Sequence, residues 1–346
     1  MNARIASVCA ATFLCAISLG THAADASLRL GLRIDLPGYT GDFDHFEYDF
    51  KTRRLWLAAE DHGTVDVLDL TTGKRLHSIR GVVTTPHGIL YVPSSNRLLV
   101  TDSGGSVSTR LIDASTRRLL GGVTLPAPKA DAIGYDASAR RLYIVNGGRD
   151  AGMEQTYLSV VDPVTLERLG DVSFDSDKVE AMAIEQSGNR LYINLTGRNE
   201  VAVLDKNTLQ RIATWPMRQA QQNAVMALDE PNRRLFVVTR KPSRLMVLDT
   251  DTGATVATFH APDRCDQLIW DAGHRRIYAL GGEGYIGVFE QKSADQYDEL
   301  ARVASAAGAK TGILVPELHR LYVAVSPGQS RSRAAILIFD VAAATD

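Results

Sequence analysis

Short runs of alternating apolar and polar residues, separated by turn residues, dominate the chain. One unit spans residues 180–215: an apolar run, a turn at 186–189, an alternating run from Arg190, a polar loop, and two further runs at 201–205 and 209–215. Runs of this kind bounded by Gly, Asn, Asp and Ser predict four short antiparallel strands. Because one such sheet cannot bury its own faces, the unit is expected to occur in copies.

The copies are marked by an Arg-Leu or Arg-Ile pair at the start of the second predicted strand. The arginines of these pairs, here called the index arginines, are Arg54, Arg97, Arg141, Arg190, Arg234, Arg276 and Arg320. They follow one another at steps of 43, 44, 49, 44, 42 and 44 residues. Seven four-stranded repeats of this period predict an all-β fold, a seven-bladed β-propeller in which neighbouring blades bury each other's faces.

Carboxylates recur at two further places in the repeat. One set ends the third predicted strand, at Asp69, Asp113, Asp162, Asp205, Asp249, Glu290 and Asp340. A second set opens the turn after the first strand, at Asp49, Asp136, Glu185, Asp229 and Asp271. Since turn residues follow them, we expect these side chains to bond backbone amides, which is a folding role.

The blades are expected at residues 39–80, 81–125, 126–174, 175–216, 217–260, 261–304 and 305–341. The last unit ends after its third strand, whereas residues 28–36 alternate like the fourth strand of the other units. We therefore expect this N-terminal segment to complete the seventh blade, which removes exposed sheet edges.

Two loops between second and third strands, residues 146–155 and 326–333, are about five residues longer than the others. We interpret them as insertions in the third and seventh repeats. Both are expected on the face where the innermost strands begin. Insertions confined to one face indicate that this face carries the function.

The first 23 residues have the pattern of a secretory signal peptide. Arg4 precedes an apolar run from Ile5 to Leu19, and Thr21 and Ala23 occupy the cleavage positions. The run is too short and too weakly flanked for a membrane span. We therefore expect residues 24–346 to form one propeller domain, a monomer located in the periplasm or secreted, with no membrane span.

Cysteine and charge exclude several classes of protein. Cys9 and Cys15 would leave with the signal peptide, so Cys265 remains and no internal disulfide is possible. Losing Arg4 as well changes 38 basic residues to 37 against 40 acidic ones, a net charge near −3 that gives no attraction for nucleic acid. Residues 330–333 form a short basic loop that we interpret as solvated.

Familiar catalytic and cofactor motifs are missing from the sequence. Residues 282–287 match the GxGxxG pattern, but they fall in a turn between strands with no helix after them to receive a phosphate. No P-loop, HExxH, GxSxG or haem-attachment CxxCH occurs. The chain is therefore expected to have no nucleotide or haem site of its own.

Several repeats also resemble a known family. Leu191-Tyr-Ile-Asn-Leu-Thr with Val201-Ala-Val-Leu-Asp, Leu142-Tyr-Ile-Val-Asn and Leu321-Tyr-Val-Ala-Val are similar to the YVTN-type β-propeller repeat. The chain after about residue 30 looks like a YncE-like secreted propeller. This resemblance implies the same seven-bladed architecture and favours a binding role, since such propellers mostly have no assigned reaction.

A polar column lies ten residues before the index arginines, where each innermost strand begins. Its members are Asp44, His87, Asp131, Glu180, Ala224, Asp266 and Lys310, and six of the seven are ionisable. The two neighbouring columns are mostly apolar or small. We therefore expect these side chains, called here the mouth column, to meet at the entrance of the central channel.

The mouth column is open to three interpretations. It is a solvated ring of mixed charge, or it binds a small organic ligand oriented by Lys310 with His45 and Asn223 alongside. In the third, four carboxylates around one fixed cation take up protons or hold a divalent metal. Its ligands would be Asp44, His87, Asp131, Glu180 and Asp266, a donor set that suits Ca, Mg, Mn or Zn.

Three functions follow from these interpretations. The first is a periplasmic or secreted propeller that binds a small ligand, a metal ion or a protein partner at the channel mouth without turnover. The second is a metal-dependent hydrolase or lyase of lactonase type, with Glu180 or Asp131 as general base and His87 as acid or ligand. The third is a redox role beside a quinone or haem partner. Cys265 would be a small buried hydrophobe, or a thiolate ligand for a softer metal.

Overall fold

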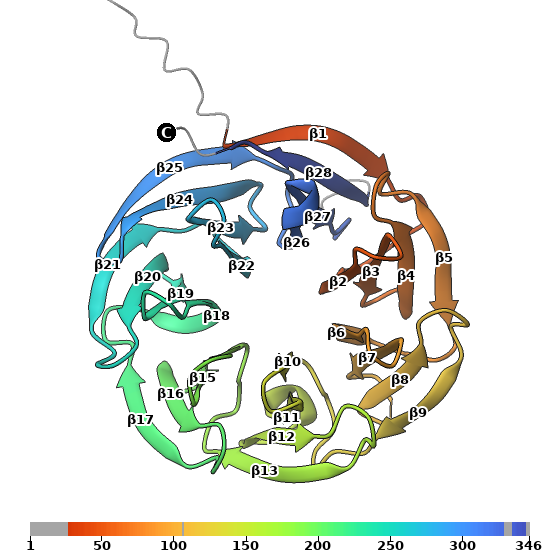
Figure 1. Ribbon diagram of the computed structural model, residues 1–346, viewed down its shortest axis with the longest axis horizontal. Helices are drawn as coiled ribbons and strands as arrows, with labels where there is room; N and C mark the ends of the chain where they lie inside the picture. Colours follow the sequence, from red (N-terminus) through yellow and green to blue (C-terminus); the bar gives the residue numbers. More distant parts are fainter. Residues whose placement is uncertain (1–26, 106, 329–333, 344–346) are drawn as a thin grey trace, which may run out of the picture.

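The computed structural model describes residues 27–105, 107–328 and 334–343. The predicted signal peptide and the basic loop at 330–333 lie outside these ranges. Over the described ranges the chain forms seven antiparallel sheets of four strands, arranged as a ring around a central channel (Figure 1). The predicted seven-bladed β-propeller is confirmed.

The strands of each blade run outward from the channel in chain order, except in blade 7. Blade 1 contains β2 (Phe46–Asp49), β3 (Arg54–Ala59), β4 (Thr64–Asp69) and β5 (Arg75–Arg80). Blade 2 contains β6 (Pro86–Val92), β7 (Arg97–Asp102), β8 (Thr109–Asp113) and β9 (Leu119–Val123). Blade 3 contains β10 (Ile133–Asp136), β11 (Arg141–Gly147), β12 (Thr156–Val161) and β13 (Arg168–Phe174).

The remaining blades repeat this arrangement. Blade 4 contains β14 (Met182–Ile184), β15 (Arg190–Leu195), β16 (Glu200–Asp205) and β17 (Arg211–Pro216). Blade 5 contains β18 (Gln221–Asp229), β19 (Arg234–Lys241), β20 (Ser243–Asp249) and β21 (Thr255–His260). Blade 6 contains β22 (Cys265–Asp271), β23 (Arg276–Gly281), β24 (Tyr285–Ser293) and β25 (Gln296–Ala304). Blade 7 contains β26 (Thr311–Val315), β27 (Arg320–Val325), β28 (Ala335–Val341) and β1 (Leu28–Asp35).

Helical structure in the described part of the chain is limited to two 3-10 turns, η1 (Arg149–Ala151) and η2 (Pro316–Leu318). The first lies in the long loop of blade 3 that the sequence predicted. None of the described helices has the length and apolar character to cross a bilayer.

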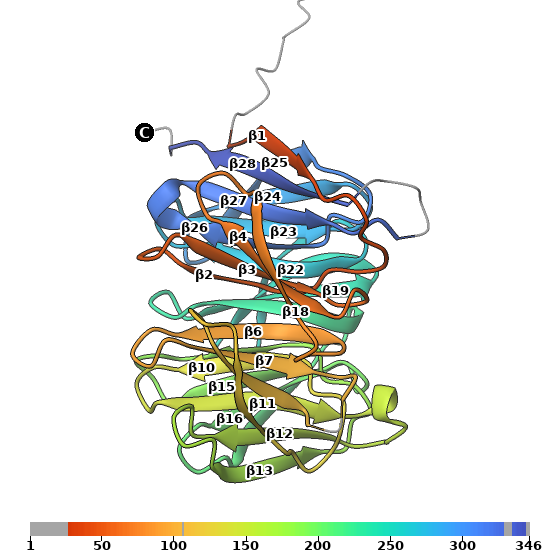
Figure 2. The same cartoon turned by 90° about the vertical axis from the view of Figure 1, so that its right-hand side faces the viewer.

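The N-terminal strand closes the ring. β1 pairs antiparallel with β28, with Leu28 opposite Val341 and Asp35 opposite Ala335. Seen from the side in Figure 2, β1 lies at the outer edge of blade 7, next to β28. Leu28 packs in the core between blades 6 and 7, and Ile34 packs against the core between blades 7 and 1. The predicted closure is confirmed.

Apolar residues of the described chain gather into seven clusters, one at each boundary between neighbouring blades. The second strand of a blade contributes most strongly, since Tyr143, Tyr192, Tyr278 and Tyr322 are all fully buried. The core is thus distributed around the ring, and each blade is stable only against its neighbours.

Six of the seven index arginines link their own blade to the next. In six cases a guanidinium N–H donates to a backbone carbonyl of the following blade or, for the sixth blade, of the C-terminal segment after β28. The bonds are Arg97 to Val164 (3.1 Å), Arg141 to Lys206 (3.2 Å), Arg190 to Thr250 (2.5 Å), Arg234 to Ala294 (3.0 Å), Arg276 to Ala342 (2.7 Å) and Arg320 to Thr71 (2.9 Å). The residue that marks the repeat in the sequence therefore joins the blades in the fold.

The turn role of the third-strand carboxylates is confirmed for the aspartates of the first five blades. Asp69, for example, accepts hydrogen bonds from the backbone N–H groups of Thr71 (3.0 Å) and Thr72 (2.8 Å). The prediction is wrong for the last two blades. Glu290 lies inside β24, which continues to Ser293, and Asp340 instead forms ion pairs with arginines of β1 and β27.

The second set of turn carboxylates also behaves as predicted. Asp136 accepts from the backbone N–H groups of Ser138 (2.9 Å) and Ala139 (3.1 Å), and Asp271 does the same for Gly273 (3.1 Å) and His274 (3.2 Å). These carboxylates belong to the face opposite the channel mouth and are accounted for by folding.

Candidate functional site

The mouth column lies where the innermost strands depart from regular pairing. In blades 2, 5 and 6 the strand register shifts around His87, Ala224 and Asp266. In the other blades β2, β10, β14 and β26 begin one or two residues after the column residue. An extra, unpaired residue re-aims its side chain.

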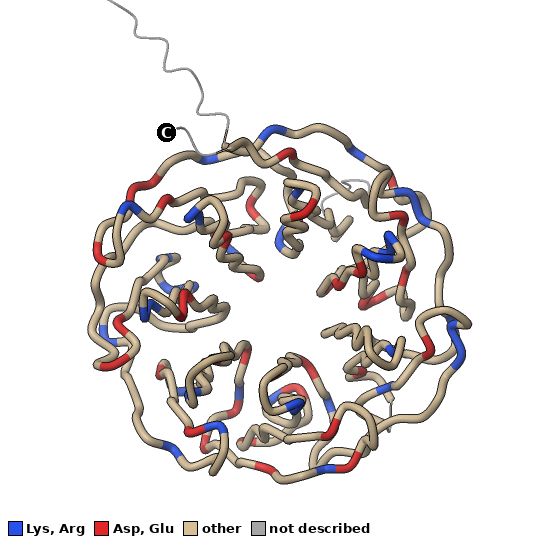
Figure 3. Tube along the Cα trace, in the orientation of Figure 1, with Lys and Arg blue, Asp and Glu red and all other residues tan. Residues whose placement is uncertain are grey.

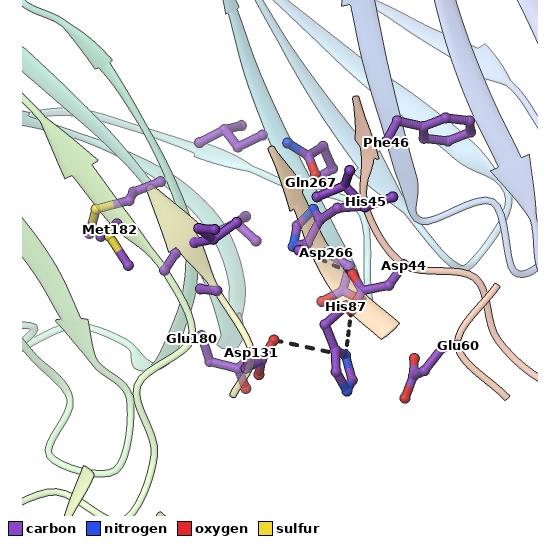
Figure 4. Close-up of a pocket in the computed structure, with 18 residues that line it drawn as sticks. Asp44, His45, Phe46, Glu60, His87, Asp131, Glu180, Met182, Asp266 and Gln267 are labelled. Carbon is purple, nitrogen blue, oxygen red and sulfur yellow. Dashed lines mark hydrogen bonds and ion pairs between the residues drawn. The ribbon is translucent and has the colours of Figure 1, made fainter. Parts of the chain in front are cut away.

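Below this rim the inner strands enclose a cavity of about 380 Å³ at the channel mouth (Figure 4). The rim consists of Asp44, Glu60, His87, Asp131, Glu180 and Asp266. The next positions along the strands are His45, Gly88, Ala132, Ala181, Val225 and Gln267. The base is apolar and consists of Phe46, Ile89, Ile133, Met182, Met226 and Leu268. Two residues of strand rise put the base roughly 7 Å below the rim.

His87 is held between two polar partners at the rim. Its Nδ1 lies 2.7 Å from Asp44 Oδ2, and its Nε2 lies 2.8 Å from Ser103 Oγ. Asp131 Oδ1 is 3.9 Å from the same Nδ1, and Figure 4 shows His87 with Asp131 and Glu180 to one side and Glu60 to the other. Carboxylates therefore surround the imidazole.

These surroundings decide the charge of His87 and Asp44. Burial lowers the pKa of His87, but the hydrogen bond to Asp44 and the charges of nearby carboxylates outweigh it and raise the pKa to about 9. Burial raises the pKa of Asp44, but His45, His87 and Lys310 outweigh it and lower the pKa to about 2. Near neutral pH the pair is therefore an imidazolium and a carboxylate, with both ring N–H groups donating.

Burial raises the pKa of two rim carboxyls, Glu180 and Glu60, and Glu60 titrates near neutral pH. Burial raises its pKa to about 7, with the charges of Asp44 and Asp61 acting in the same direction and those of His87 and Lys310 opposing. It lies in the loop after β3 and was not expected in the site. Burial and the charges around it together set its protonation, as expected for a functional pocket.

Two basic residues missed in the sequence neutralise the other rim carboxylates. Lys178 Nζ lies 2.8 Å from Asp150, 3.5 Å from Asp131 and 4.0 Å from Glu180. Burial lowers the pKa of Lys178, but the charges of these carboxylates outweigh burial and hold the pKa well above its ordinary value. Asp150 belongs to the long loop of blade 3, so that loop does reach the mouth.

Arg240 bridges two rim carboxylates across blade 5. Its guanidinium lies 3.3 Å from Glu180 Oε1 and 2.6 Å from Asp266 Oδ1. Ala224, the mouth-column residue of blade 5, is fully buried and offers no charge. The place that an ionisable residue has in the other blades is thus taken in blade 5 by a side chain from β19.

Lys310 completes the charged ring outside the cavity. Its Nζ lies 2.9 Å from Asp266 Oδ2 and 3.1 Å from Asp42 Oδ2. The expectation of one fixed cation among four carboxylates is therefore wrong: Lys178, Arg240, Lys310 and protonated His87 alternate with the acids. Acidic and basic residues are also interspersed over all the blades (Figure 3).

The other residues expected near the site separate clearly. His45 lines the cavity, with Nε2 3.4 Å from Asp44 Oδ1. Asn223 does not: it is fully buried and donates to Asn194 Oδ1 (2.8 Å) and the Glu200 carbonyl (2.9 Å). Cys265 is also fully buried, and burial raises the pKa of its thiol to about 12. It is a packed thiol rather than a thiolate ligand.

The five residues expected as one metal set do not form one cluster. Within the described ranges, ligand atoms come within 4.8 Å of one another in the set Asp44, Glu60 and His87. Asp131 and Glu180 lie beside Lys178, and Asp266 lies between Arg240 and Lys310. The candidate metal ligands are thus three residues rather than five, and they include Glu60, which was not expected.

The sequence did contain a signal for Glu60 and Arg240, though not for Lys178. Counting six residues forward from an index arginine reaches the end of the second strand, and three of these positions are Glu60, Ser103 and Arg240. The same position in blade 7 is Ser326, whose hydroxyl accepts from the backbone N–H of Phe43 (3.0 Å). Side chains at this second fixed offset therefore contact the mouth column from the ends of the second strands.

Comparison with known proteins identifies the fold and no family. No protein-family model matches the chain, and no curated protein matches it. Among solved structures, a chain of the crystal structure of the mitotic checkpoint complex aligns with a TM-score of 0.75 and 14% identity, over 99% of each chain. The likeness shows the propeller fold alone. The site must therefore be interpreted from its own residues.

The charge of His87 predicts how stability depends on pH. Its pKa rises from about 6.5 in the unfolded chain to about 9 in the fold, so the proton stabilises the fold fully below pH 6.5. That contribution is lost as the pH rises through 9. Urea unfolding between pH 7 and 9.5 should show a loss on the order of 2 kcal/mol. The His87→Gln variant should lack this loss.

A matched control separates this effect from general alkaline destabilisation. His77→Gln replaces an exposed histidine of β5 and should keep the wild-type pH dependence. Glu60 affects the pH dependence of stability mainly below pH 7. Because its pKa is raised to about 7, stability falls as the pH rises from about 4.5 to 7. An unchanged pH profile in His87→Gln would contradict the assigned imidazolium.

Proposed function

We propose that this chain is a binding propeller that holds a small molecule in the mouth of its central channel without turnover. The observation that carries the proposal is the cavity of about 380 Å³, with its charged rim and apolar base. Ligand pockets of about 300–1,000 Å³ commonly combine an apolar lining with a few placed polar groups. The cavity belongs to this class.

The rim supports binding because its side chains are fixed before any ligand arrives. His87 is held by Asp44 and Ser103, and Arg240 is held by Glu180 and Asp266. Side chains that are already ordered lose little entropy when a ligand binds. The pairing of acids and bases around the rim also orients these side chains in advance, which favours binding.

Location and relationship are part of the same proposal. The sequence pattern of residues 1–23 supports export to the periplasm or medium, and the repeat motifs support a YVTN-type, YncE-like propeller. A protein partner could approach the same face, where the long loop of blade 3 lies. Export would be tested directly by the N-terminal sequence of the protein recovered from the periplasm or culture medium.

Filling the cavity should abolish ligand binding. Ala181 lines the wall between rim and base, and Ala181→Phe should occupy the space that a ligand needs. The variant and the wild type are incubated with the small-molecule fraction of a cell extract, desalted, and examined by native mass spectrometry. We expect a bound mass in the wild type and at least a tenfold smaller bound fraction in Ala181→Phe.

The matched control is Ala137→Phe, which adds the same side chain in an exposed turn after β10. It should bind as the wild type does, and thermal unfolding should show that both variants are folded. The absence of any bound mass in the wild type, or its persistence in Ala181→Phe, would contradict the proposal.

A divalent metal is the second candidate, and the cluster of Asp44, Glu60 and His87 favours it. Two carboxyls and one imidazole suit a hard or borderline ion. The ion would have to displace the proton of His87, since metal ligands bind in their deprotonated form. A metal here would supply the Lewis acid of the lactonase-type alternative, with Glu180 or Asp131, which lies 3.9 Å from His87, as candidate base.

Metal analysis after equilibration with Ca, Mg, Mn and Zn tests this candidate. It predicts one ion per chain, lost in Asp44→Asn and His87→Gln but retained in Asp266→Asn, because Asp266 is engaged by Arg240 and Lys310. A panel of lactones and esters, with and without chelator, then separates an enzyme from a binder. No bound metal, or equal loss in all three variants, would exclude this three-residue site.

A further inference from the structure

Acidic side chains outnumber basic ones among the groups that line the cavity. Its lining includes the carboxyls of Asp44, Glu60, Asp131, Glu180 and Asp266, but no Lys or Arg among the described residues. The basic side chains in the lining are the imidazoles of His45 and His87. The ammonium and guanidinium groups of the ring contact the carboxylates without lining this cavity.

The rim carboxylates differ in how completely the protein satisfies them. Asp266 contacts Arg240 at 2.6 Å and Lys310 at 2.9 Å, and Asp44 contacts His87 at 2.7 Å. These two carboxylates are firmly paired. They are poor candidates for binding a further cation.

Asp131 and Glu180 are paired much more loosely. The nearest cationic atom to Asp131 lies at 3.5 Å, and the nearest to Glu180 lies at 3.3 Å. Lys178, which lies beside both, makes its short contact with Asp150 instead, at 2.8 Å. Their side chains remain 28% and 20% exposed, respectively. Two carboxyls whose contacts with cations are long therefore lie on neighbouring blades and face the cavity.

The base of the cavity below these two carboxyls is apolar and suits an apolar part of a ligand. Met182 follows Glu180 by two residues, and Ile133 follows Asp131 by two residues, so the apolar groups lie directly below the loosely paired acids. Met226 lines the base from the next blade. Methionine side chains adapt to different apolar shapes and contact aromatic rings favourably.

We infer that the ligand is a small organic cation with an apolar body, its ammonium or guanidinium group against Asp131 and Glu180 and its body against Met182, Met226 and Ile133. The inference rests on the proposed binding function and adds the chemical class of the ligand. A cation placed there completes the pairing of two carboxylates, while an anion would face five carboxyls.

Three probes that share a phenylethyl body test the inference by isothermal titration calorimetry at pH 8 and low salt. They are 2-phenylethylamine, which is cationic, 2-phenylethanol, which is neutral, and 3-phenylpropanoate, which is anionic. We expect the amine to bind at least tenfold more tightly than the alcohol, and the propanoate to bind more weakly than either. Equal or tighter binding of the alcohol or the propanoate, or no binding of the amine, would overturn the cation assignment.

Charge-neutral variants locate the cation. Asp131→Asn and Glu180→Gln should each weaken the amine at least fivefold and leave the alcohol unchanged. Glu154→Gln removes an exposed carboxylate in the long loop of blade 3 and should change neither. Thermal unfolding confirms that each variant is folded. An equal loss for amine and alcohol in Asp131→Asn would show a structural effect and overturn the placement.

Failure of this inference is distinguishable from failure of the proposed function. If the alcohol or the propanoate binds best and Ala181→Phe abolishes that binding, the cavity still binds ligands but the cation class is wrong. If Ala181→Phe changes the binding of no probe and of no extract component, both proposals are wrong.

Discussion

The packing of each blade against its neighbours is the constraint on which this molecule depends. A four-stranded sheet with two apolar faces is stable only between two others, so the ring must close. The index arginines reinforce that dependence, because their guanidinium groups bond carbonyls beyond their own blade. Closure also has a consequence for chemistry: it brings the starts of all the innermost strands to one axis.

Crowding on that axis creates the electrostatic problem that the mouth solves. Carboxylates from several blades converge, and without neutralisation their repulsion would be costly in a partly buried site. The neutralising groups come from two directions. Lys178 and Lys310 lie at or just before the mouth column, whereas Arg240 reaches in from the second strand of its blade. The pairing is uneven, which leaves Asp131 and Glu180 available to a ligand.

The fold could be predicted from sequence because blade packing imposes a period on the chain. Arg54 to Arg320 mark that period, and residues 28–36 are recognisable as the strand missing from blade 7. The mouth column could be predicted for the same reason, since a fixed offset from the index arginine specifies a fixed height in every blade. Features that recur at a constant spacing in the repeat can therefore be located from the sequence alone.

The neutralising groups were harder to predict, because spacing specifies where a backbone lies and not how far a long side chain reaches. The offset that holds Arg240 in blade 5 holds glycine in blades 3 and 6, and Lys178 lies at neither offset. Lys178 and Arg240 cross between blades through four or five rotatable bonds. The misplacement of Asn223 has a related cause: one residue from the column, its side chain turns away from the channel and hydrogen-bonds Asn194. Glu60 was missed because it approaches the rim from a different strand end.

The central claim is that fixed cations hold the rim carboxylates in place, and a double-mutant cycle between Arg240 and Asp266 tests it most directly. Unfolding free energies are measured for the wild type, Arg240→Met, Asp266→Asn and the double variant. The account predicts a coupling energy of at least about 1 kcal/mol, with the double variant less destabilised than the sum of the single ones. Single effects that add to within about 0.3 kcal/mol would contradict it.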